Sequence, residues 1–139
     1  MHFKPEQYDA ILHRLVDGGT LGGEPVPGNP NMLIPWFLMS VFAYEELDDP
    51  FLTDGCYDWC CRELDARWDA IEHQHKHLID RDALRTGTAS YLKGKLPTTV
   101  QNAARALLRD YEHPEEVRPR AKPSIDDLLG LAVTLNDLL

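Results

Sequence analysis

Apolar residues recur at intervals of three and four along most of the chain, the pattern of amphipathic helices. The first such stretch predicts a helix over residues 5–16, ended by Gly18 and Gly19. Its apolar face consists of Tyr8, Ile11, Leu12, Leu15 and Val16. Residues 18–30 contain five glycines and three prolines, which predicts a loop. No stretch shows the two-residue alternation typical of a sheet.

The second predicted helix, over residues 32–47, is apolar on nearly every side. Between residues 32 and 44, apart from a proline, Ser40 is the only conventionally polar residue. A helix of this kind belongs at the centre of a domain. Asn31 is expected to cap it, and the run Asp48-Asp49-Pro50 is expected to end it.

The third predicted helix, over residues 54–72 with Thr53 as its cap, has a clean apolar stripe. The stripe contains Tyr57, Cys60, Cys61, Leu64, Trp68 and Ile71. At about 100° per residue, carboxylates follow one edge of that stripe. This acidic row contains Asp54, Asp58, Asp65, Asp69 and Glu72. Trp59 falls on the opposite side and is expected to be exposed, or covered by another segment.

The second half of the chain predicts a short helix over residues 80–86 and a longer one over 97–111. A proline-containing linker follows at 113–123, and then a C-terminal amphipathic helix at 124–139. We therefore expect a compact, single-domain, all-α helical bundle over residues 1–112, built around the hairpin at 32–72. The leucine face of the C-terminal helix is expected to fill a groove in this domain or in a partner, including a second copy of the chain.

Composition narrows the class of protein. The chain is 43% hydrophobic and 27% charged, as globular domains are, and its net charge of −9 argues against direct binding of nucleic acid. The longest apolar run is too short to cross a membrane, and the N-terminus does not resemble a signal peptide. Three cysteines crowded into one segment suit reduced thiols in a cytoplasm better than disulfides.

A histidine cluster at residues 73–77 raises the question of a metal. On a helix His73 and His77 share a face, and a cysteine such as Cys60 completes a zinc shell in this hypothesis. Against it, the apolar stripe makes Cys60 a core residue, and the spacing matches no established zinc signature. We expect no bound metal, with the histidines capping a helix end or forming a polar surface.

The segment 44–64 resembles the helical hairpin that opens bacterial NAD-dependent DNA ligases. In that family a tyrosine ends one helix, an Asp-x-Pro turn follows, and Asp-x-x-Tyr-Asp opens the next helix ahead of a Glu-Leu pair. The matching residues are Tyr44, Asp48, Pro50, Asp54, Tyr57, Asp58, Glu63 and Leu64. A gapless match of this kind is more specific than a short glycine motif.

In the ligases this hairpin closes over the nicotinamide mononucleotide (NMN) half of NAD. The resemblance implies that Tyr44 stacks on the nicotinamide ring and that Asp54, Tyr57 and Asp58 bind the ribose and phosphate surroundings. The chain departs from the family at Glu45, where ligases often have His or Tyr, and at Cys56, where they have an acidic residue. The alternative is that only turn geometry is preserved, with Tyr57 in the core and Asp54 facing the helix dipole.

The chain lacks the Lys-x-Asp-Gly motif that adenylation requires, so we expect no ligation by this chain alone. The stretch as a whole, including the runs at residues 34–39 and 72–77, also resembles small stand-alone bacteriophage proteins described as ligase-like. We therefore expect a non-catalytic accessory protein, acting in the host cytoplasm, that binds a nicotinamide nucleotide or a phage or host protein. The residues expected at a protein interface are Trp59, Asp65, Asp69 and Glu72. The alternative is an accessory role in DNA ligation, repair or replication with a separate catalytic chain.

Overall fold

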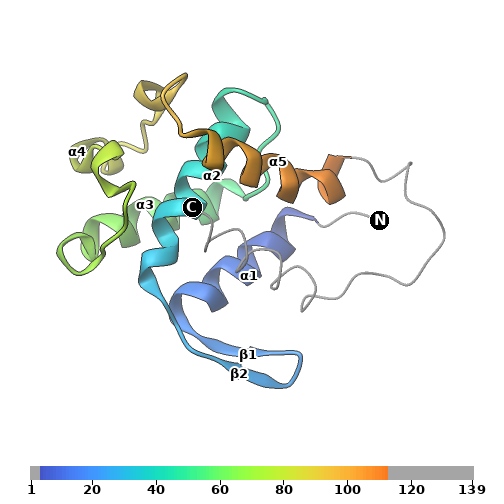
Figure 1. Cartoon of the computed structure of the whole chain (residues 1–139). Helices are drawn as coiled ribbons and strands as arrows, with labels where there is room; N and C mark the ends of the chain where they lie inside the picture. Colours follow the sequence, from blue (N-terminus) through green and yellow to red (C-terminus); the bar gives the residue numbers. More distant parts are fainter. Residues whose placement is uncertain (1–3, 113–139) are drawn as a thin grey trace.

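The computed structural model of the protein describes residues 4–112, in which a central helix is surrounded by other helices (Figure 1). The central helix is α2 (Leu33–Glu45), and all but its last two residues are buried. Helices α1 (Pro5–Asp17), α3 (Asp54–Ala66) and α5 (Thr98–Glu112) pack against it. Because α2 is apolar on every side, it is most stable when other helices surround it. The predicted all-α class and the central place of this helix are confirmed.

The remaining helical elements are short and lie mostly between α3 and α5. They are η1 (Pro30–Met32), η2 (Trp68–Ala70), η3 (Lys76–Leu78), α4 (Arg81–Leu84) and η4 (Ser90–Leu92). Asp80 caps α4 by accepting a hydrogen bond from the backbone N–H of Asp82 at 3.0 Å. Within residues 4–112, no helix has the length and apolar character needed to span a membrane.

The predicted loop at 18–30 instead contains a small antiparallel hairpin, β1 (Gly19–Leu21) with β2 (Glu24–Val26). It projects from the end of α1, away from α5 (Figure 1). Gly22 and Gly23 connect the strands with φ angles of 59° and 85°, values that favour glycine in tight hairpin turns. The expectation of no strand was wrong because strands of three residues are too short to show an alternation.

The start of the central helix also differs from the prediction. Asn31 does not cap α2, whose cap position is held by Met32 without a side-chain hydrogen bond. Asn29 instead caps the preceding 3₁₀ turn η1, by accepting a hydrogen bond from the Asn31 N–H at 3.1 Å. The Asn31 side chain instead accepts a hydrogen bond from the backbone N–H of Glu72 at 2.9 Å. Asn31 therefore holds a distant loop rather than the helix that follows it.

Helix α3 ends at Ala66, six residues before the predicted end. The chain then turns, and Lys76 Nζ donates hydrogen bonds to the carbonyls of Trp68 at 2.6 Å and Ile71 at 2.8 Å. The same ammonium group lies 4.8 Å from the centre of the Trp68 ring. Ile71 reaches the core from this turn rather than from a helix. The helical spacing of apolar residues continues past Ala66 in the sequence, which is why the predicted helix was too long.

The other predicted helices are confirmed within one or two residues, a normal margin for helix ends. Helix α4 begins one residue after the start and ends two residues before the end of the predicted range 80–86, and Gly87, three residues after its end, has a φ of 74°. The predicted linker at 113–123 and the C-terminal helix at 124–139 lie outside the described residues.

Candidate functional site

The bend between α2 and α3 depends on one residue in the left-handed region. Asp48 has a φ of 51°, a conformation that aspartate tolerates better than most residues. Just after it, the Asp49 N–H returns to the carbonyl of Ala43 at 2.8 Å. Phe51 then enters the core, where it is completely buried. The bend therefore reverses the chain within a few residues and brings α3 back beside α2.

The start of α3 is fixed by helix α1. The Thr53 hydroxyl caps α3 by accepting a hydrogen bond from the Cys56 N–H at 3.2 Å, as predicted. Asp9 of α1 accepts two hydrogen bonds from Thr53, from its N–H at 3.1 Å and from its hydroxyl at 2.6 Å. This contact holds the first turn of α3, and with it Asp54, in place.

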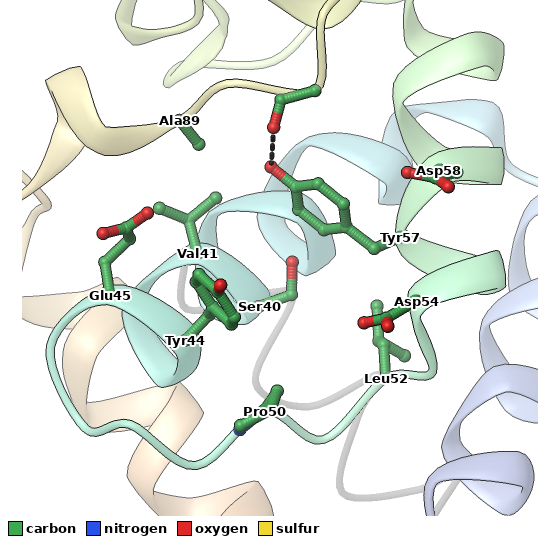
Figure 2. A pocket seen from close by; sticks show the side chains of 11 residues that line it. Ser40, Val41, Tyr44, Glu45, Pro50, Leu52, Asp54, Tyr57, Asp58 and Ala89 are labelled. Atoms are coloured by element: carbon green, nitrogen blue, oxygen red, sulfur yellow. Dashed lines mark hydrogen bonds between the residues drawn. The ribbon is translucent and has the colours of Figure 1, made fainter.

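A pocket of about 350 Å³ lies between α2 and α3, beneath the segment that follows α4 (Figure 2). All four residues that the ligase resemblance singled out line it: Tyr44, Asp54, Tyr57 and Asp58. The other lining residues are Ser40, Val41, Glu45, Pro50, Leu52, Gly87 and Ala89. Helical spacing explains the grouping, because residues three or four apart on one helix share a face. The structure therefore brings together the four residues that the sequence proposed as a site.

Tyr57 forms a fixed wall of the pocket. Its ring stacks on Phe37 of α2, with centroids 5.7 Å apart, and its hydroxyl donates a hydrogen bond to the Gly87 carbonyl at 3.3 Å (Figure 2). Burial, with a smaller contribution from the nearby Cys61 thiol, raises the pKa of Tyr57 well above its usual value. The phenol is therefore neutral at physiological pH and remains a hydrogen-bond donor.

Tyr44 is the more accessible aromatic residue. It lies in the last turn of α2, and its side chain is 60% exposed. Among the side chains that the structure describes, it is the one large hydrophobic side chain that is exposed. A tyrosine so exposed beside a pocket offers a ring face to a ligand without any loss of core packing.

The pocket is acidic. Its lining includes the carboxylates of Glu45, Asp54 and Asp58, and among residues 4–112 no lysine, arginine or histidine contributes to it. Glu45 was not predicted as a site residue, although its four-residue spacing from Val41 places both on the pocket side of α2. The hydroxyl of Ser40 already donates its hydrogen bond to the Phe37 carbonyl, at 2.7 Å, so this donor is not available to a ligand. The site is therefore suited to a cation, and in particular to an aromatic cation.

The predicted acidic row is not continuous. Asp54 and Asp58 line the pocket, whereas Asp69 and Glu72 lie beyond the end of α3 at Ala66. The helical spacing that aligned them does not apply there. The prediction of one continuous acidic row along α3 was therefore wrong.

The carboxylate of Asp65, further along α3, forms ion pairs with two arginines. Its carboxylate lies 2.9 Å from Arg81 and 3.5 Å from Arg85. The hydrogen bond from Arg81 is the main cause that lowers the pKa of Asp65. Asp69 is 95% exposed and lies 4.0 Å from Arg81. A role for these carboxylates in binding a protein stays a prediction.

Trp59 is covered by another segment, one of the two predicted arrangements. Its ring lies 4.0 Å from the His13 ring of α1, centre to centre, and it packs against the hydrophobic core while remaining partly accessible. Trp59 is therefore part of the α1–α3 contact, which leaves less of its ring available to a partner.

The residues considered for zinc are not grouped. Cys60 is fully buried in the core, and a hydrogen bond with Cys56, together with burial, raises the pKa of its thiol. His73 and His77 do not share a helix, because a turn separates them, and His73 Nδ1 accepts a hydrogen bond from the His75 N–H at 3.1 Å. Burial lowers the pKa of His73. Across the described part of the chain, no three or more His, Cys, Asp or Glu side chains are arranged to hold a metal ion.

No protein-family model matches this sequence, and no curated protein or solved structure is significantly similar to it. The function is therefore inferred from the pocket and from the motif in residues 44–64. The pocket combines an exposed tyrosine ring with carboxylates contributed by two helices. This combination favours a small ligand with a positively charged aromatic ring.

Proposed function

We propose that this protein is a non-catalytic binding protein whose pocket takes the nicotinamide end of a nicotinamide nucleotide, NMN or NAD. One observation carries the proposal. The four residues that resemble the ligase hairpin come from two helices, and all of them line a single pocket. Preservation of the turn alone explains less, because it requires neither an exposed Tyr44 nor a cavity beside it.

The chemistry of the lining suits this ligand. A pyridinium ring over the face of Tyr44 gains about 0.5–2 kcal/mol from the attraction between a cation and an aromatic ring. The carboxylates of Asp54 and Asp58 are acceptors for ribose hydroxyls. The neutral Tyr57 ring closes one side of the pocket. A volume of about 350 Å³ is near the small end of the range for ligand pockets, which suits one nucleoside.

The proposed role is that of a phage-type accessory protein acting in the host cytoplasm, on the resemblance to ligase-like phage proteins. The role is non-catalytic because the sequence has no Lys-x-Asp-Gly motif for adenylation. Any step in DNA ligation, repair or replication then belongs to a separate catalytic chain. Docking of a phage or host protein through the acidic row has less support. Asp65 is already paired with arginines, and Trp59 packs on His13.

Thermal unfolding in the presence of NMN or NAD tests the proposal. A ligand that binds the native state stabilises it, by about 2.7 kcal/mol at 100 times its Kd. The Tm of the wild-type protein should therefore rise with either nucleotide. Tyr44→Ala should abolish this rise, whereas Tyr44→Phe, which keeps the ring face, should retain it.

The variants themselves should fold normally, because an exposed side chain usually changes stability by no more than about 0.5 kcal/mol when it is replaced. Absence of any Tm shift in the wild-type protein at millimolar NMN and NAD would rule out nucleotide binding. A Tyr44→Ala protein that still responds would show that binding occurs elsewhere.

A further inference from the structure

Resting on the proposed function, we propose that the pocket selects the oxidised, positively charged pyridinium nucleoside and leaves its phosphates outside. Nicotinamide riboside, with a net positive charge, should then bind more tightly than NMN. NMN in turn should bind more tightly than NADH, whose dihydropyridine ring is neutral. The order is opposite to that of a pocket built to hold a phosphate group.

The distribution of charge in the pocket favours a cationic ligand. Glu45 lies on one side, and Asp54 and Asp58 lie on the other, so that a ligand in the pocket has carboxylates on both sides (Figure 2). Within the described part of the chain, no basic residue lines the pocket to offset them. A cationic ring is attracted from both sides, whereas a phosphate group in the same place is repelled.

The start of α3, beside the pocket, is poorly suited to a phosphate group. The N-terminus of a helix binds phosphate through its free backbone N–H groups. Here the Cys56 N–H is already bonded to the Thr53 hydroxyl, and Asp54 adds a negative charge in the first turn. The net charge of −9 on the whole chain repels phosphate further.

The size of the pocket limits how much of the ligand it can enclose. A pocket of about 350 Å³ has room for a nicotinamide ring and its ribose but not for a dinucleotide. The phosphates of NMN and NAD must therefore extend into solvent. They contribute repulsion there rather than specific contacts. Glu45 then acts as a specificity residue that favours the charged ring over the neutral one.

Calorimetric titration with nicotinamide riboside, NMN and NADH tests this selectivity in the wild-type protein and in Glu45→Gln. The control is Glu46→Gln, which removes the same charge from the neighbouring, exposed residue outside the pocket. We expect nicotinamide riboside to bind at least about threefold more tightly than NMN, the scale of one partly screened charge. Glu45→Gln should weaken nicotinamide riboside about threefold and bring NMN closer to it, whereas Glu46→Gln should change neither.

Salt provides an independent readout. Raising NaCl from about 50 mM to about 500 mM shortens the screening length severalfold, so the riboside should bind more weakly while NMN is unaffected or improves. Asp58→Asn, on the opposite side of the pocket, is a second variant and should reproduce the effect of Glu45→Gln.

The outcomes separate the two proposals. If NMN binds more tightly than nicotinamide riboside, or if Glu45→Gln behaves like Glu46→Gln, the selectivity is wrong although the pocket still binds nicotinamide nucleotides. If none of the three ligands binds the wild-type protein, the proposed function itself is wrong. If the riboside binds more tightly than NMN, and this preference is lost in Glu45→Gln and in Asp58→Asn, the result would support the proposed function and the selectivity together.

Discussion

Two glycines show how strongly the surroundings of a single residue decide its tolerance to change. A Cβ atom on Gly28 would lie 2.7 Å from the carbonyl carbon of Asp17 and from the carbonyl oxygen of Val16. These are backbone atoms at the end of α1, so neither can move aside cheaply. Gly55, in the first turn of α3, has open space where its Cβ atom would be.

We predict opposite effects of alanine at these positions. Gly28→Ala should lower the free energy of unfolding by about 1–3 kcal/mol, the usual cost of forcing atoms into a packed site. Gly55→Ala should raise it by about 0.5–1 kcal/mol, because alanine loses less chain entropy in a helix than glycine does. Urea unfolding followed by circular dichroism measures both. Equal stability of the two variants would contradict the close approach of residue 28 to α1.

At the scale of the elements, the hydrogen bonds between α1 and the start of α3 connect stability to the pocket. Asp9 holds Thr53, and the flanking residues Leu52 and Asp54 both line the pocket. A change in α1 should therefore alter ligand binding, although no residue of α1 lines the pocket.

Asp9→Ala is predicted to destabilise the protein by about 1–3 kcal/mol, because it removes both hydrogen bonds from a partly buried site. It should also weaken NMN binding. Asp9→Asn keeps an acceptor for the Thr53 N–H, so it should lose less stability and less NMN affinity than Asp9→Ala. Thermal unfolding with and without NMN measures the two effects together. Unchanged NMN affinity in Asp9→Ala would show that the pocket does not depend on this contact.

The elements also show what the sequence can and cannot predict. The apolar central helix and the Thr53 cap were predicted correctly because each depends on local pattern. The end of α3 and the role of Asn31 were not, because they depend on Lys76 and Glu72, residues distant in the sequence. Three-residue strands leave no pattern at all.

The pocket shows the same division. The predicted residues Tyr44, Asp54 and Tyr57 come from one continuous motif, so a resemblance in sequence was enough to group them. Gly87 and Ala89 come from a segment about thirty residues further along the chain. Nothing in the local pattern of that segment indicates that it packs over the hairpin.

At the scale of the whole molecule, one hydrophobic cluster extends from Tyr8 in α1 to Leu108 in α5. The Tyr8 hydroxyl donates a hydrogen bond to the Leu107 carbonyl at 2.6 Å, joining residues 99 positions apart. Because every main helix contributes to this one cluster, residues 4–112 are expected to unfold as a unit.

Tyr8→Phe should therefore lower the free energy of unfolding of the whole domain, by about 1–3 kcal/mol, since it removes the donor of a buried hydrogen bond. Tyr91→Phe is the control, because the bond from the Asp80 N–H to the Tyr91 hydroxyl lies at the exposed edge and its loss should cost less. Tryptophan fluorescence and circular dichroism should give the same transition midpoint in each variant. Separate midpoints would show that the domain is not a single cooperative unit.

The hydrogen bond from Tyr57 to the Gly87 carbonyl has a consequence for protein engineering. The helical hairpin from Leu33 to Ala66 carries both tyrosines and all three carboxylates of the pocket. The segment that covers them, with Gly87 and Ala89, lies outside the hairpin. Transplanting the hairpin into another scaffold would therefore transfer the recognition residues without their enclosure. A functional graft has to extend at least through Ala89, which makes the recognition unit larger than its sequence motif.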